Sequence, residues 1–211
     1  MMEVLEELIR LPRKGEYMEI RLENIFSTTI RVQNGVVERI RVGTDEGGYI
    51  RLLAPRGSWW FESFQRWDDL KDKVEKAIAG ASLLPQSNIE VVRRAPVRDE
   101  HKVTLPDDFR FKSLEDKTSL LLLYDQVLRE TSPFLVSSLV EYRDEFRQIY
   151  LANSDGSLIY LEEPDISVSF VATARKEDNI EIYRNGVAGK AGFELVKNQE
   201  TLAQEVGQRA V

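Results

Sequence analysis

Apolar and polar side chains alternate along many stretches of this chain, which is the pattern of strands with one buried face. The first clear case is residues 17–23, where Met18, Ile20 and Leu22 are separated by charged residues. Five such segments are predicted in each half of the chain. They are residues 17–23, 26–32, 36–42, 48–54 and 58–63, and then residues 134–144, 146–153, 157–163, 165–175 and 180–186.

Apolar residues spaced three or four positions apart predict helices between these groups of strands. After Asp69, for example, Leu70, Val74 and Ala77 would share one helical face. Ser113 followed three residues later by Asp116 predicts a capped N-terminus for another helix. The predicted helices cover residues 3–11, 68–84, 113–131 and 200–210.

Two short polar sequences predict tight hairpins. Asn34-Gly35 joins two alternating segments, and these residue types best tolerate the positive φ that a type I′ turn requires at both central positions. Ser154-Asp155-Gly156 joins a second pair of segments in the same way. Consecutive hairpin connections predict antiparallel sheets rather than parallel ones.

The order of elements predicts the α+β class, with helices packed on one face of antiparallel sheets. Both halves follow the order helix, five strands, helix, so we expect an internal duplication. Residues 85–112 carry three of the seven prolines and many charges, which predicts a linker or irregular crossing with an edge strand at residues 89–92. The expected units are residues 1–84 and 113–211, joined by this linker.

Composition excludes several classes of function. The chain has 211 residues and a net charge of −7, which argues against a nucleic-acid platform because phosphates require a basic surface. The absence of cysteine excludes disulfides, thiolate nucleophiles and cysteine-ligated metals. The longest apolar run is too short to cross a bilayer, and no signal-peptide pattern opens the chain. We therefore expect a soluble cytoplasmic protein that contacts neither membrane nor nucleic acid.

No catalytic constellation is visible. The single histidine, His101, follows Asp99 and Glu100 in a polar segment, and adjacent residues of an extended segment point apart. The series Gly186, Gly189 and Gly192 lacks the Lys-Ser/Thr ending of a phosphate loop. Residue chemistry therefore predicts a scaffold with no catalytic residue and no metal ligand.

The most aromatic stretch of the chain is a candidate contact site. It contains Trp59, Trp60, Phe61 and Trp67. Alternation would place one of Trp59 and Trp60 in the core and the other outside. One interpretation is core and sheet-edge packing. The other is a contact surface for a partner subunit or a peptide, formed by Trp59, Trp60 and Trp67.

The order of these motifs resembles the N-terminal region of the TldD/PmbA family. The resemblance begins with a hairpin containing Asn-Gly-x-x-Glu and continues over a glycine-rich break, a strand with a central arginine and a tryptophan strand. The helix at residues 116–130 and the second hairpin extend it over essentially the whole chain. Matching positions are Asn34, Gly35, Glu38, Gly47, Arg51, Gly57, Trp59, Phe61, Asp155 and Gly156. Tyr49, Trp60 and Glu62 depart from the family pattern, which has glycine or small residues near these places.

The resemblance implies a function that residue chemistry alone does not. Catalytic members of the family resemble zinc metallopeptidases, hydrolases whose His-Glu-x-x-x-His motif lies downstream of the region matched here. Two histidines on one helical face with an intervening glutamate are what activation of a metal-bound water requires. The resemblance thus implies zinc in full-length members and no cofactor in this chain.

Three hypotheses follow. In the first, the chain is the N-terminal scaffold of a TldD/PmbA-like peptidase that acts on small unfolded peptides. It would help to wall the peptide cavity and form a homo- or heterodimer with a TldD/PmbA-type subunit. In the second, it is a stand-alone, non-catalytic partner of such a subunit. In the third, it is an unrelated soluble α+β binding module.

Overall fold

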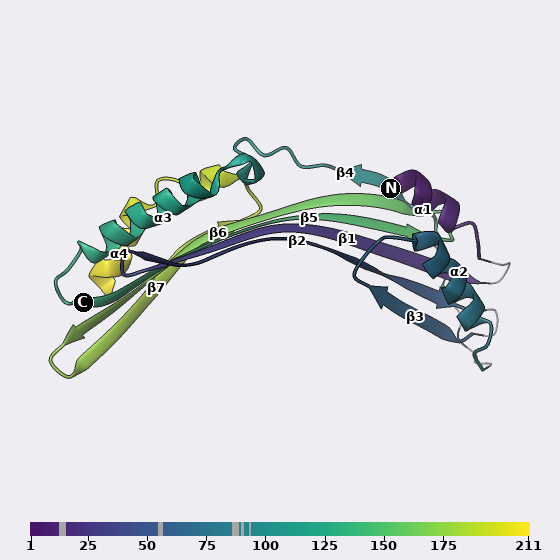
Figure 1. Cartoon of the computed structure of the whole chain (residues 1–211), viewed down its shortest axis with the longest axis horizontal. Coiled ribbons are helices and arrows are strands. Elements are labelled where there is room, and N and C mark those ends of the chain that lie inside the picture. The colour runs from purple at the N-terminus through teal and green to yellow at the C-terminus, as the bar shows by residue number, and fades with distance from the viewer. Residues whose placement is uncertain (13–15, 55–56, 86–88, 90, 93) are drawn as a thin grey trace. The chain divides into compact units, whose positions relative to one another are not determined.

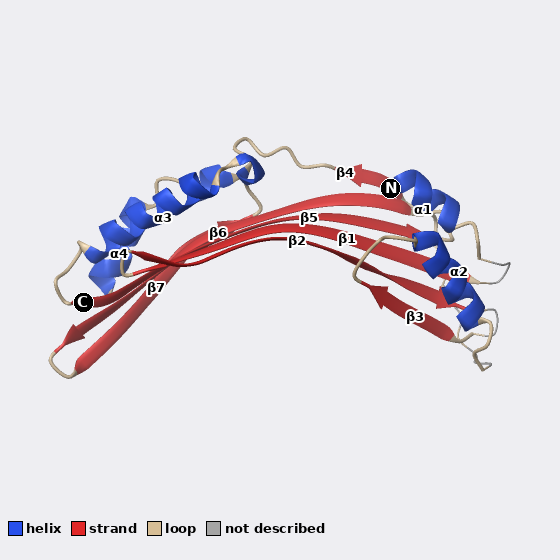
Figure 2. Ribbon diagram, in the orientation of Figure 1, coloured by secondary structure: helices blue, strands red, loops and turns tan. Residues whose placement is uncertain are grey.

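A computed structural model describes residues 1–12, 16–54, 57–85, 89, 91–92 and 94–211. Helices and strands are labelled in Figure 1 and distinguished by colour in Figure 2. The helices are α1 (Met2–Leu8), α2 (Leu70–Ala81), α3 (Leu114–Arg129) and α4 (Glu200–Arg209), with short 3-10 turns η1 (Phe109–Phe111) and η2 (Phe193–Val196). The strands are β1 (Tyr17–Gln33), β2 (Val36–Leu53), β3 (Trp59–Phe64), β4 (Arg98–His101), β5 (Leu135–Asn153), β6 (Leu158–Lys176) and β7 (Asn179–Gly189).

The strands form one seven-stranded, mostly antiparallel sheet, which confirms the α+β class. Its order is β3-β2-β1-β5-β6-β4, with β7 also paired with β6. The pairing of β6 with β7 is antiparallel, whereas β4 pairs with β6 in parallel. The predicted cap of α3 is confirmed, because the Ser113 hydroxyl accepts a hydrogen bond of 3.0 Å from the Asp116 N–H.

The expectation of five strands in each half is wrong, because neighbouring segments fuse. Each half contains helix, three strands and helix, namely α1-β1-β2-β3-α2 and α3-β5-β6-β7-α4. The same order of elements in both halves is compatible with an internal duplication but does not establish it, so the duplication stays a prediction. The fused pairs are residues 17–23 with 26–32 in β1, 36–42 with 48–54 in β2, 134–144 with 146–153 in β5, and 157–163 with 165–175 in β6.

The residues that suggested breaks are accommodated within the strands. Pro164 lies between the part of β6 that pairs with β4, residues 158–161, and the part that pairs with β7, residues 166–176. Its missing N–H therefore removes no bond to either of these strands. Gly48 lies where β2 passes so close to β1 that a Cβ would be 2.4 Å from the Arg21 carbonyl oxygen. This glycine marks a close approach of two backbones and not the end of a strand.

The edge strand expected at residues 89–92 lies further along the chain. Ile89, Val91 and Val92 are described and are outside any strand, while Glu90 lies outside the described residues. Pairing begins only after Pro96, which cannot donate a backbone hydrogen bond. The Leu158 N–H donates to the Val97 carbonyl at 2.8 Å, and β4 follows directly.

The chain divides into two compact units, and each draws on both halves of the sequence. Unit 1 comprises residues 1–25, 44–102 and 147–162, and unit 2 comprises residues 26–43, 103–146 and 163–211. The long strands β1, β2, β5 and β6 contribute residues to both units. Within the described residues, no helix combines the length and apolar character needed to cross a lipid bilayer.

In unit 1, helices α1 and α2 supply apolar residues that pack on one face of the strands. Alternate residues of β1 and β2 form the other side of this core, as their period-two pattern predicts. Each of the principal members is almost completely buried. They are Leu5, Leu8, Met18, Ile20, Leu22, Ile50, Leu52, Val74 and Ala77.

In unit 2, helices α3 and α4 pack together on strand residues of the same alternating kind. The Tyr124 hydroxyl donates to the Val196 carbonyl at 2.7 Å and accepts from the Gln199 N–H at 3.1 Å. This pair of bonds ties α3 to the segment that leads into α4. The strand residues of the core are Ile30, Val32, Val140, Tyr142, Phe146, Ile166, Val168, Phe170, Ala172 and Ala174.

A buried ion pair lies within the core of unit 2. Lys117 of α3 is 2% exposed, and its Nζ lies 2.5 Å from Oδ2 of Asp144 on β5, which is fully buried. The Tyr142 hydroxyl donates to the same oxygen at 2.5 Å. Burial and the neighbouring carboxylate raise the pKa of Tyr142, so this phenol remains a donor. Asp144 thus depends on Lys117 for the opposite charge that compensates its burial.

We predict that Lys117→Met destabilises the fold by about 3–5 kcal/mol, because it leaves the Asp144 carboxylate buried without a counter-charge. Urea unfolding followed by circular dichroism measures the change. The double variant Lys117→Met/Asp144→Asn should recover part of the loss, because no uncompensated charge remains.

The matched control is Lys71→Met, the same substitution in an exposed pair with Glu75 on α2. It should change the free energy of unfolding by less than about 0.5 kcal/mol. If Lys117→Met costs no more than Lys71→Met, Asp144 does not depend on this lysine.

Candidate functional site

Six residues of unit 1 gather on the sheet face that points away from the hydrophobic core. They alternate with core residues along β1, β2 and β3, and the register of β2 with β3 places Arg51 opposite Phe61 and Leu53 opposite Trp59. We call this group the outer-face cluster. It consists of Tyr17, Glu19, Tyr49, Arg51, Trp59 and Phe61.

Glu19 is the centre of the outer-face cluster. The Tyr49 hydroxyl donates to its Oε1 at 2.8 Å, and Arg51 Nη2 donates to its Oε2 at 3.0 Å. The Tyr17 hydroxyl donates to Oε2 at 3.2 Å. Three donors from two strands therefore converge on one carboxylate whose side chain is only 13% exposed.

Aromatic rings surround this polar centre. The Arg51 guanidinium lies 5.1 Å from the centroid of the Trp59 ring, within cation–π range. Tyr17 meets Trp59 edge-on at 6.3 Å, and Tyr49 lies 5.5 Å from Phe61. Phe61 is 63% exposed. The hydrogen bonds to Glu19 thus hold Tyr49 and Arg51 in place. The exposed rings of Phe61 and Trp59 pack against these two side chains and form an apolar surface.

The two phenols of the cluster are stabilised in their neutral form. Burial, followed by the hydrogen bond to Glu19 and its charge, raises the pKa of Tyr49 to about 12. Burial and Glu19 also raise the pKa of Tyr17. Both side chains remain hydrogen-bond donors to Glu19 at neutral pH, which preserves the geometry of the cluster.

A recess of about 320 Å³ adjoins the cluster at the glycine pair of β2. The Trp67 Nε1 donates to the Gly47 carbonyl of this segment at 3.0 Å. The recess is lined by Arg21, Glu23, Ile25, Asp45, Glu46, Gly47, Gly48 and Tyr49. Its wall carries charges of both signs, so it does not by itself indicate one class of ligand.

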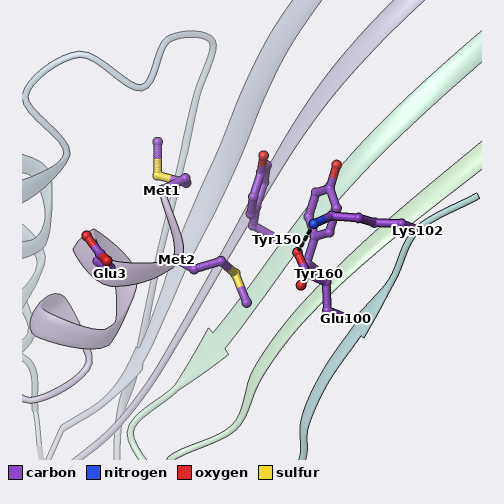
Figure 3. A pocket seen from close by; sticks show the side chains of 7 residues that line it. All are labelled: Met1, Met2, Glu3, Glu100, Lys102, Tyr150 and Tyr160. Atoms are coloured by element: carbon purple, nitrogen blue, oxygen red, sulfur yellow. Dashed lines mark ion pairs between the residues drawn. The ribbon is translucent and has the colours of Figure 1, made fainter.

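A second cavity of unit 1, about 370 Å³ in volume, is shown in Figure 3. Two tyrosines from β5 and β6 form one wall, and residues at the start of the chain, in β4 and directly after β4 form the others. The lining residues are Met1, Met2, Glu3, Glu100, Lys102, Tyr150 and Tyr160. We call this cavity the tyrosine pocket.

The three tryptophans singled out in the sequence do not form one surface. Trp59 belongs to the outer-face cluster, whereas Trp60 packs against the hydrophobic core of unit 1. There it lies so close to α2 that a Cβ at Gly80 would be 2.6 Å from its ring. Trp67 meets Tyr150 edge-on at 5.7 Å. Of the three tryptophans, Trp59 alone therefore belongs to the outer-face cluster.

Asn34 and Gly35 form the turn between β1 and β2, with φ of 51° and 80°. The tight hairpin predicted there is confirmed. The Asn34 side-chain oxygen accepts a 2.8 Å hydrogen bond from the Ser138 N–H, which attaches the turn to β5. Glu38 pairs with Arg31 at 3.0 Å on the adjacent strand. These contacts give the three positions a structural role in unit 2.

Of the other matching positions of unit 1, Gly47 and Arg51 lie in β2, Trp59 and Phe61 lie in β3, and the remaining three lie in turns. Gly57 has a φ of 81°, and its N–H donates to the Ala54 carbonyl at 2.9 Å. Gly156 has a φ of 99°. The side chain of Asn153 organises this second turn by accepting from the N–H of Asp155 at 3.1 Å.

The described residues do not fit a zinc site. No group of three or more His, Cys, Asp or Glu side chains among them could hold a metal ion. His101 lies exposed on β4, opposite Leu161 of β6. The zinc that the family resemblance implies for full-length members therefore has no ligand set in the described part of this chain.

Sequence reasoning missed the centre of the outer-face cluster. Glu19 and Tyr49 are 30 positions apart, and each alone is an ordinary polar residue on an alternating strand. The available signal was Tyr49 itself, a large residue in a place where the motif pattern favours glycine. Tyr150 and Tyr160 were missed for a similar reason, because the β5–β6 hairpin brings them together.

Comparison with known families matches nearly the whole chain. The model of the PmbA/TldA metallopeptidase domain 1 matches residues 18–81, and that of the PmbA/TldA metallopeptidase central domain matches residues 107–211. A metalloprotease of Synechocystis is 32% identical over 209 residues, which are 98% of this chain and 45% of the relative. The chain thus spans less than half the length of this relative.

Solved structures share the fold. A Thermotoga maritima protein assigned as a modulator of a DNA gyrase superposes with a TM-score of 0.76 at 16% identity, over 100% of this chain and 47% of its own. TldE from Thermococcus kodakarensis superposes with a TM-score of 0.66 at 13% identity, over 99% of this chain and 45% of its own. At these identities the likeness concerns architecture.

We predict that Tyr49 ionises near pH 12 and that its contribution to the stability of the fold is lost in the same pH range. Because its pKa is raised from 10.0 to about 12 in the folded state, this contribution is complete below pH 10 and is lost as the pH rises through about 12. Alkaline absorbance titration of the protein and of Tyr49→Phe, compared by difference, isolates this phenol. Glu19→Gln should lower the pKa of Tyr49 only part of the way, because burial remains. Ionisation of Tyr49 near pH 10 would contradict the proposed hydrogen bonding.

Proposed function

The chain belongs to the TldD/PmbA metallopeptidase family, and on this premise we propose that it is the N-terminal scaffold of a cytoplasmic peptidase acting on small unfolded peptides. The observation that carries the proposal is the pair of family regions in order, residues 18–81 and 107–211. The named metalloprotease relative extends well beyond the part matched here. We assign no hydrolytic step to residues of this chain.

The outer-face cluster supplies the contact surface in this proposal. Phe61 and Trp59 offer exposed aromatic area, and aromatic residues are enriched where protein surfaces associate. Arg51 and the phenols are already bound to Glu19, so contact at this surface requires little further ordering of side chains. We propose that a TldD/PmbA-type subunit, in a homo- or heterodimer, covers this cluster.

The test is association measured by analytical ultracentrifugation, with the 211-residue chain alone and mixed with the full-length Synechocystis relative. We predict a dimer in one of the two samples. Phe61→Glu should weaken it by roughly tenfold or more, because a charge would be buried at an aromatic contact.

Phe111→Glu is the matched control, because Phe111 is 85% exposed in unit 2 and lies outside the cluster. It should leave the association unchanged. Monomers in both samples, or equal weakening by the two substitutions, would exclude the outer-face cluster as the subunit contact.

A further inference from the structure

The tyrosine pocket is not explained by a scaffold role. Its volume of about 370 Å³ falls within the range of small-ligand sites, roughly 300–1,000 Å³. Figure 3 shows Tyr150 and Tyr160 on adjacent strands, with Glu100 and Lys102 facing them from the neighbouring segment. The parallel register of β4 with β6 places Glu100 directly opposite Tyr160.

The aromatic wall of the pocket is held rigidly. The Tyr150 and Tyr160 rings have centroids 4.8 Å apart and an interplanar angle of 39°. Trp67 supports Tyr150 edge-on from another side. The Tyr160 hydroxyl donates to Glu162 at 2.6 Å and accepts from the Gln148 amide at 2.8 Å.

Both phenols are stabilised in the neutral form. Burial, followed by the hydrogen bond to Glu162, raises the pKa of Tyr160. Burial also raises the pKa of Tyr150. Neutral, fixed phenol rings present electron-rich faces, which attract ammonium and guanidinium groups.

The pocket already contains one ammonium group. Lys102 Nζ lies 2.8 Å from Glu100 Oε1, as the dashed line in Figure 3 shows. The pKa of Lys102 is raised by this hydrogen bond and by the charge of Glu100, with a smaller effect of Glu162. The lysine side chain is 63% exposed, so it can leave the pocket wall at little cost in packing.

The remaining lining carries charges of both signs. Glu3 and Glu100 supply two carboxylates, Lys102 supplies an ammonium group that is paired with Glu100, and Met1 carries the α-ammonium group of the chain. Met1 and Met2 add flexible thioether side chains, which adapt to ligands of different shape. When Lys102 leaves the pocket wall, Glu100 loses its partner, and a ligand cation, unlike an anion, can replace that partner.

We propose that the tyrosine pocket binds the cationic side chain of a peptide, an arginine or a lysine, in place of Lys102. The cation would pack on the ring of Tyr150, which the buried Tyr160 supports from behind, and would pair with Glu100. The choice of a peptide rests on the proposed function, whereas the preference for a cation rests on the pocket alone. The proposal therefore gives the scaffold a selectivity for basic peptides.

The test is titration of the 211-residue chain, labelled with ¹³C at the methionine methyl groups, with N-acetyl-arginine amide. The chain has three methionines, of which Met1 and Met2 line the pocket and Met18 is fully buried in the core. We predict saturable shifts of the Met1 and Met2 signals and none of Met18. N-acetyl-citrulline amide, which has nearly the same shape and no charge, should leave all three unchanged.

Two variants test the roles of the lining residues. Glu100→Gln should weaken arginine-amide binding by about two- to fivefold, because the exposed carboxylate that pairs with the cation is lost. Lys102→Met should strengthen it, because the competing ammonium is removed. Glu100 is exposed on the edge strand β4, and Lys102 is exposed directly after it, so neither change threatens the core.

Equal shifts with the citrulline compound, or no saturable shift at Met1 and Met2, would overturn the proposal. This outcome would leave the scaffold role untouched, because that role is measured by subunit association. Failure of association together with binding of arginine amide would instead retain the cation pocket and reject the proposed subunit contact at the outer-face cluster.

Discussion

Alternation of side chains between the two faces of long strands is the constraint on which this structure depends. Strands β1, β2, β5 and β6 each run for 17–19 residues, and a slip of one residue would move every core side chain to the opposite face. The turn at Asn34-Gly35 sets the register of β1 with β2, and its attachment to Ser138 extends that constraint to β5. The strand register therefore determines both which side chains form the core and which form the outer surface of the sheet.

The candidate sites are consequences of the same constraint. Glu19 lies between two core residues, Met18 and Ile20, so the register that buries them also directs its carboxylate toward Tyr49 and Arg51. The β5–β6 hairpin likewise aligns the two rings of the tyrosine pocket. Neither arrangement needs a mobile loop, and binding surfaces on strands keep their geometry better than surfaces on loops.

The sequence predicted the features that depend on neighbouring residues. The α+β class, the Asn34-Gly35 turn and the Ser113 cap follow from local pattern, and the order of motifs led to the correct family. The number of strands was wrong because Gly48 and Pro164 disfavour strands locally, whereas their surroundings tolerate them. The cluster around Glu19 depends on the register of residues 30 positions apart, and the pair of Tyr150 and Tyr160 depends on the exact register of the predicted β5–β6 hairpin. Local pattern predicts neither register.

The central claim is that this chain shapes and positions a peptidase without performing the hydrolysis. The most direct measurement compares the purified 211-residue chain with the full-length Synechocystis relative for bound metal and for cleavage of an unstructured peptide. The account predicts that the relative holds metal and cleaves, while the chain alone does neither. Stoichiometric metal in the 211-residue chain, or cleavage that follows its concentration, would contradict the account and return attention to His101 and its acidic neighbours.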